Sequence, residues 1–73
     1  MTNYQALIKI LPTLEKLVRT KLLSRTIIIH IAVYDNFYQL DGPKMERYEA
    51  VAEEFNMSSK NVQRIILLMN KPI

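Results

Sequence analysis

The amino-acid sequence predicts an all-α protein, a small bundle of four to five helices that ends in two helices joined by a tight turn. Apolar residues recur at steps of three and four, and only one Gly and three Pro interrupt them. A single isoleucine-rich run has no second run with which to pair as a strand. The 73 residues are expected to form one domain, residues 1–73, whose small core leaves association with a second copy open.

Composition excludes several classes of protein. The chain contains no Cys, which rules out disulfide scaffolds and zinc sites built on thiolates. Its longest mainly apolar run, residues 27–34, is far shorter than the roughly 20 residues that a membrane-spanning helix requires. No signal peptide, cofactor motif, metal-ligand cluster or small-molecule site is evident, so we expect a soluble cytoplasmic protein without membrane, cofactor or metal.

The distribution of charge is more informative than the net charge of +3. Along the sequence, one group of acidic residues lies between two groups of basic residues. Clustered Lys and Arg are typical of a surface that binds a polyanion, although an ordinary solvated surface has the same composition. The basic groups are Lys16, Arg19, Lys21 and Arg25, then Lys60, Arg64 and Lys71; the acidic group is Glu46, Glu49, Glu53 and Glu54.

The first 23 residues carry an apolar stripe at helical spacing that Pro12 interrupts. Proline removes a backbone donor and clashes one turn back, so the segment forms either two short helices or one kinked helix, with residues 13–23 as the firmer half. The stripe is expected to serve either as bundle core or as a dimerisation surface. It consists of Tyr4, Leu7, Leu11, Leu14 and Val18.

A second helix is expected over residues 24–40. Its isoleucines favour a strand by propensity, but the apolar residues fall at helical spacing and no partner strand exists. Gly42 and Pro43 then mark the clearest boundary, because glycine accepts the left-handed backbone and proline can open the next helix. The expected inner face comprises Ile27, Ile31, Tyr34 and Tyr38, extended by Phe37 and Leu40.

Two further helices are expected, one from Lys44 to residue 55 and one from Ser58 to about Asn70. Asn56 is suited to a left-handed stop, and the Ser58 hydroxyl to an N-cap. Inward positions of the first are Tyr48, Val51, Ala52 and Phe55, and those of the second are Val62, Ile65, Ile66 and Met69, with Met57 beneath the turn. At least one of Leu67 and Leu68 must face outward, toward the N-terminal helices or a partner.

The stretch AEEFNMSSKNVQRII, residues 52–66, resembles the helix-turn-helix signature of bacterial DNA-binding proteins. More loosely, residues 24–70 resemble small bacterial helix-turn-helix proteins of the transposase-like or regulator type, and region 4 of sigma factors. Asn56 is a departure, since the family most often has Gly there. The residues that match the family pattern are Ala52, Met57, Ser58, Val62, Arg64 and Ile66.

The resemblance implies sequence-specific binding of double-stranded DNA, in transcription regulation or mobile-element control, with the last helix in the major groove. No β-wing is expected after it. A single bare module binds weakly, so a homodimer through the N-terminal helices is expected. From side-chain chemistry, candidates for base contacts are Ser59, Lys60, Asn61, Gln63 and Arg64, and candidates for phosphate contacts are Lys44, Arg47, Ser58 and Lys71.

Catalysis is not expected. His30 is the only histidine and lies in an apolar run, so it is interpreted as a core or partly buried residue. Glu53 and Glu54 are adjacent and point to different sides of a helix, which prevents a paired-carboxylate site. The alternative to DNA binding is a helical protein-interaction module that docks on a larger regulator or polymerase through its exposed leucines.

Overall fold

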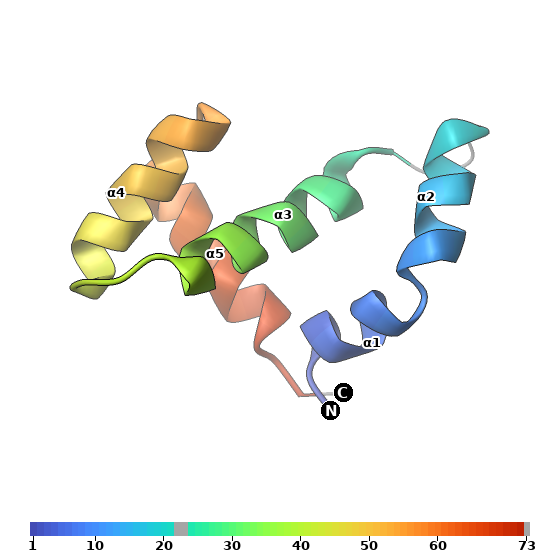
Figure 1. Ribbon diagram of the computed structural model, residues 1–73, viewed down its shortest axis with the longest axis horizontal. Coiled ribbons are helices and arrows are strands. Elements are labelled where there is room, and N and C mark those ends of the chain that lie inside the picture. The colour runs from blue at the N-terminus through green and yellow to red at the C-terminus, as the bar shows by residue number, and fades with distance from the viewer. Residues whose placement is uncertain (22–23, 73) are drawn as a thin grey trace.

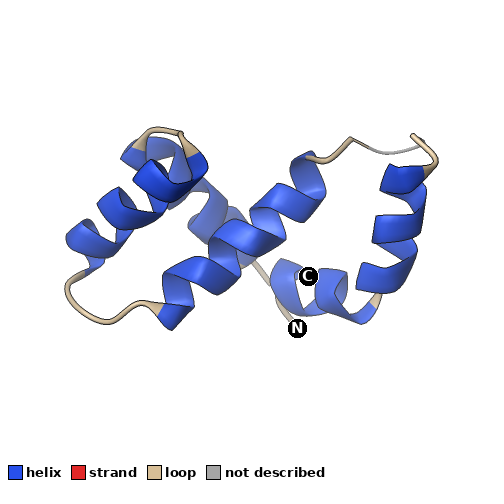
Figure 2. Cartoon of the chain, turned by 45° about the horizontal axis from the view of Figure 1, so that its top comes forward, coloured by secondary structure: helices blue, strands red, loops and turns tan. Residues whose placement is uncertain are grey.

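The computed structural model describes residues 1–21 and 24–72 and confirms the predicted all-α fold class. Figures 1 and 2 show the helices in two views. Within the described residues there is no strand, only an isolated bridge between Thr2 and Pro72, and no helix is long and apolar enough to cross a membrane. The helices are α1 (Asn3–Lys9), α2 (Leu11–Arg19), α3 (Thr26–Gln39), α4 (Lys44–Phe55) and α5 (Ser59–Met69).

The N-terminal segment forms two short helices, which settles the alternative that the sequence left open. Pro12 lies in the first turn of α2, where backbone N–H groups have no acceptor within the helix, so the absence of an N–H in proline breaks no hydrogen bond. The predicted extension of this helix to residue 23 was wrong, because α2 ends at Arg19 and Lys21 has a φ of 65°. Leu22 and Leu23, which the prediction included, lie outside the described residues.

The isoleucine-rich run forms helix α3, as predicted. It packs against α1, α4 and α5, and a helix with neighbours on several sides is apolar over much of its circumference. The inner face differs from the prediction: Val33 is fully buried, whereas Tyr38 is 52% exposed. Ile31 and Phe37 are buried as expected.

The core lies where α3, α4 and α5 meet. Val33, Val51 and Val62, one from each helix, are fully buried. Leu14 of α2 completes the buried cluster, and Tyr4 and Leu7 of α1 pack against it. The N-terminal stripe therefore contributes to the core of its own chain.

The two ends of the described chain lie side by side, as Figure 1 shows. The backbone N–H of Asn3 donates to the carbonyl of Lys71 at 2.9 Å, and the Asn3 side-chain amide donates to the carbonyl of Leu68 at 2.9 Å. The Asn3 side chain adds a second donor to the Leu68 carbonyl, which also accepts from the backbone N–H of Lys71 at 3.3 Å. Helix α1 is thus attached to the end of α5.

Three tyrosines strengthen this attachment. The Tyr4 and Tyr34 rings stack at 4.0 Å, and the Tyr4 hydroxyl donates to the Asp35 carboxylate. The Tyr34 hydroxyl donates to Asn70 Oδ1 at 2.9 Å, and Asn70 Nδ2 donates to the Tyr38 hydroxyl at 3.1 Å. The hydrogen bond to Asp35 raises the pKa of Tyr4 to about 12, and burial raises the pKa of Tyr34.

We expect Tyr4→Phe to lower the free energy of unfolding by about 1 kcal/mol at pH 8, because it removes a hydrogen bond to a carboxylate. Since the folded-state pKa of Tyr4 lies above its ordinary value of 10.0, its stabilising effect is complete below pH 10 and disappears as pH rises through about 12. Urea unfolding should therefore show a smaller difference between wild type and variant at pH 11. An equal difference at both pH values would contradict this role.

Candidate nucleic-acid interface

Helix α4 begins after a turn that requires glycine. Gly42 has a φ of 112°, which side-chain-bearing residues rarely adopt, and Pro43 follows with an extended backbone as the N-cap. On the inner side of α4, Val51 and Ala52 are buried, and the Tyr48 ring stacks on Phe37 of α3 at 4.9 Å. The outer side carries the exposed carboxylates Glu46, Glu49, Glu53 and Glu54.

The turn between α4 and α5 has the predicted conformation. Asn56 is left-handed, with φ 54° and ψ 51°, and ends α4. The Met57 N–H then donates to the carbonyl of Ala52 at 2.9 Å, a pattern typical of a left-handed C-cap. Met57 is half-buried and packs against the core, so the turn is fixed to the structure beneath it.

The start of α5 is also as predicted. Ser58 is extended, and its hydroxyl oxygen accepts from the N–H of Asn61 at 3.1 Å. This bond satisfies one of the amides that lack a partner in the first turn of a helix. Ser58 is thus confirmed as an N-cap, while its predicted phosphate contact stays a prediction.

Helix α5 has one buried and one exposed side. Val62, Ile65, Ile66 and Met69 are at most 4% exposed, as the spacing predicted. On the opposite side lie Lys60, Arg64 and Leu67, whose separations of four and three residues place them on one stripe. We call these three residues the α5 stripe. Both Leu67 and Leu68 are exposed, at 67% and 44%.

The predicted base-contact residues do not lie equally far from the core. Lys60, Asn61 and Arg64 are exposed, whereas Ser59 and Gln63 are half-buried at the margins of α5. The side-chain amide of Asn61 donates to Met57 Sδ at 3.6 Å, so it lies against the turn. The structure therefore brings together Lys60 and Arg64 as the two cations of one exposed face.

The predicted phosphate-contact residues separate in the structure. Lys44 and Lys71 are exposed, at the start of α4 and after the end of α5. Arg47 is half-buried: its guanidinium lies 4.0 Å from the centre of the Phe37 ring, and its Nε donates to the Phe37 carbonyl at 3.4 Å. These contacts hold α4 against α3, and a further contact of Arg47 with phosphate stays a prediction.

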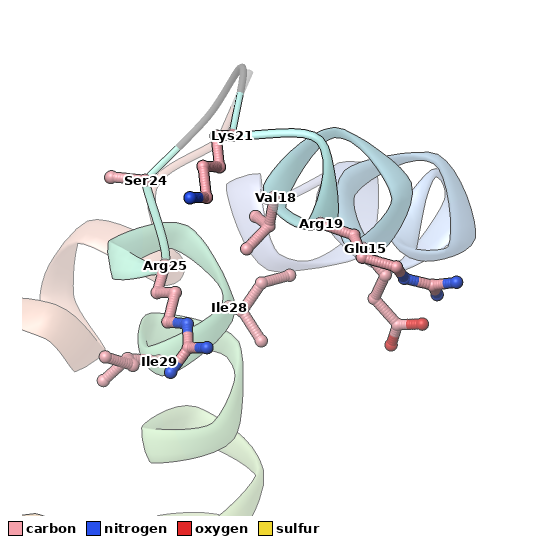
Figure 3. Close-up of a pocket in the computed structure, with 8 residues that line it drawn as sticks. All are labelled: Glu15, Val18, Arg19, Lys21, Ser24, Arg25, Ile28 and Ile29. Atoms are coloured by element: carbon pink, nitrogen blue, oxygen red, sulfur yellow. The ribbon is translucent and has the colours of Figure 1, made fainter.

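The first cluster of basic residues in the sequence lies away from α4 and α5. Helix α2 is at the opposite end of the molecule from α4 (Figures 1 and 2), so Arg19, Lys21 and Arg25 lie far from the turn that begins α5. They border an open hollow between α2 and the start of α3, across which Val18 and Ile28 point toward each other (Figure 3). The two basic groups therefore do not form one continuous surface.

The sequence predicted Lys60 and Arg64 as outward residues but left open which of Leu67 and Leu68 faces outward with them. A helical projection of residues 58–70 would have placed Leu67 on the α5 stripe, because it lies three residues after Arg64 and seven after Lys60. The contacts of Asn70 with Tyr34 and Tyr38 have no such signal, because they join residues more than 30 positions apart.

His30 is half-buried, and no group of three acidic or histidine side chains among the described residues is placed to hold a metal.

Comparisons with family models, with curated proteins and with solved structures gave no match to this chain.

The left-handed turn residue gives a direct test of the unit formed by α4, the turn and α5. We expect Asn56→Ala to lower the free energy of unfolding by roughly 1 kcal/mol, because alanine is strained in this conformation. Asn56→Gly should leave it unchanged or raise it slightly, since glycine adopts the conformation without strain. Urea unfolding measures both. Equal stabilities of the alanine and glycine variants would contradict the assigned backbone geometry.

Proposed function

We propose that this protein binds double-stranded DNA, with α5 in the major groove and α4 behind it as the supporting helix of a helix-turn-helix. The observation that carries the proposal is the two-sided character of α5. One side is fixed in the core, while the other carries two exposed cations and ends at an N-terminus capped by Ser58. A rigid helix with a basic outer face is the element that major-groove recognition requires.

The separation of charge between the two helices supports this orientation. Exposed glutamates lie on α4, whereas no acidic residue follows Glu54 in the sequence. DNA phosphates are attracted to the α5 stripe and repelled by the outer side of α4. This arrangement favours one docking orientation over its reverse.

Side-chain chemistry assigns a role to each candidate. Lys60 and Arg64 match the O6 and N7 acceptors of guanine, whereas Asn61 and Gln63 match the edge of adenine. Lys44 and Lys71 are exposed cations and are assigned phosphate contacts, which set affinity and its dependence on salt. The resemblance of residues 52–66 to bacterial DNA-binding proteins extends the proposal to transcription regulation or mobile-element control.

The proposal predicts that wild-type protein binds a labelled mixed-sequence duplex with an affinity that falls steeply as salt rises. The Lys60→Ala/Arg64→Ala variant should bind at least tenfold more weakly, with a salt slope shallower by about one unit for each cation that contacts phosphate. Fluorescence anisotropy over a salt series measures both quantities. Circular dichroism checks that the variant remains folded, as expected for two exposed residues.

The matched control is Lys16→Ala/Arg19→Ala, which removes the same charge from exposed positions on α2. It should retain most of the affinity. An equal loss in both double variants would show that binding follows net charge rather than the α5 stripe. Absence of duplex binding by wild type even at low salt would reject DNA as the partner and favour a protein that covers the exposed leucines.

We further propose a homodimer through the N-terminal helices, because one module of this size binds DNA weakly. Since Leu7, Leu11 and Leu14 pack within the chain, the contact would use the outward side chains Ile8 and Ile10, which are 36% and 49% exposed. Light scattering at high micromolar concentration should give twice the chain mass of 8.6 kDa, and Ile10→Lys should halve it. A monomeric mass for wild type would contradict the dimer.

A further inference from the structure

Leu67 is the unexplained member of the α5 stripe. Its side chain is 67% exposed, more than that of any other large apolar residue among those that the structure describes. It lies on the same side of α5 as Lys60 and Arg64, away from the core. Folding buries only a third of this leucine, so most of its apolar surface is available to a partner.

The charge around Leu67 indicates what kind of partner fits. Lys60 and Arg64 precede it on the stripe, Lys71 follows the end of α5, and the chain has no acidic residue after Glu54. A protein partner would have to desolvate three cations, of which Lys60 and Lys71 belong to a residue type that is depleted at protein interfaces, although Arg is enriched there. A DNA groove instead surrounds a small apolar contact with phosphates, which complement the cations.

The dimensions of a helix and a duplex are compatible with a base contact. Leu67 lies seven positions after Lys60, which corresponds to about 10.5 Å along the helix axis. Base pairs are stacked about 3.4 Å apart, so the stripe spans about three base-pair steps. Thymine is the base that presents an apolar group, its C5-methyl, in the major groove.

We propose that Leu67 is a specificity-determining residue that contacts the C5-methyl group of a thymine in the bound duplex. This inference rests on the proposed DNA-binding function and adds to it the chemistry of one position in the site. Lys60 and Arg64 supply hydrogen bonds and charge, while Leu67 distinguishes thymine from the other bases by an apolar contact, without a hydrogen bond. The bound sequence should therefore contain a required thymine about one base pair from the position read by Arg64 and about three base pairs from the position read by Lys60.

The test uses the full chain and duplexes selected by wild-type protein from a randomised pool. Each thymine of the selected site is replaced in turn by deoxyuridine, which lacks only the methyl group. One replacement per half-site should weaken wild-type binding roughly fourfold, the value of burying one methyl group. Leu67→Ala should bind the thymine and deoxyuridine duplexes equally at that position, so that the double-mutant cycle shows coupling.

Two further variants make the result specific. Leu67→Met keeps an apolar side chain of similar size and should preserve the preference for thymine. Leu68→Ala removes a neighbouring leucine that is 44% exposed but lies off the stripe, and it should also preserve the preference. The salt dependence of all three variants should equal that of wild type, because no charge is changed.

Each contrary result is distinguishable. If wild type binds duplex with a steep salt dependence but no deoxyuridine replacement couples to Leu67, the thymine contact is wrong and the proposed function stands. If Leu67→Ala weakens binding equally to the thymine and deoxyuridine duplexes, or changes the mass in light scattering, Leu67 does not read the thymine methyl group and the inference is overturned. If wild type binds no duplex even at low salt, the proposed function and this inference fail together.

Discussion

The packing of α3 against α5 is the contact on which the rest of the structure depends, because each of these helices also contacts α1 and α4. Phe37 of α3 and Met69 of α5 are each 1% exposed, and Val33 and Val62 are fully buried. Buried apolar side chains of α3 and α5 make up most of the small core, which Val51 and Ala52 of α4 and Leu14 of α2 complete. The positions of α4 and α1 follow from it, since each lies against both helices.

This junction also determines what α5 can present to a partner. Because its inner side is fully used by α3 and α4, its outer side is free of any packing requirement and can carry Lys60, Arg64 and Leu67. The N-cap at Ser58 and the left-handed Asn56 fix the direction in which α5 leaves the turn. A face held in this way loses little conformational entropy on binding, which is the advantage of placing a recognition surface on a rigid helix.

The N-terminal segment is part of the same domain rather than a separate arm. Tyr4 stacks on Tyr34 of α3, and Asn3 is hydrogen-bonded to residues at the C-terminal end of α5. Asn70 bonds to both Tyr34 and Tyr38, so the end of α5 is attached to α3 as well. Any partner that contacts the outer surface of α1 would therefore act on a helix that is connected to the end of α5 by short, direct contacts.

The fold class, the two helices on either side of Asn56, and the buried and exposed sides of α5 were all predicted from the amino-acid sequence. These features depend on neighbouring residues: a cap hydroxyl, a left-handed turn residue, and apolar positions repeated every three or four residues. The packing of the helices, in contrast, determines that Val33 faces inward and Tyr38 outward, and that Arg47 lies on the Phe37 ring. It likewise determines that Asn70 joins two tyrosines of α3. These arrangements join residues on different helices, so they depend on how the helices pack, and the periodicity of a single helix contains no information about its neighbours.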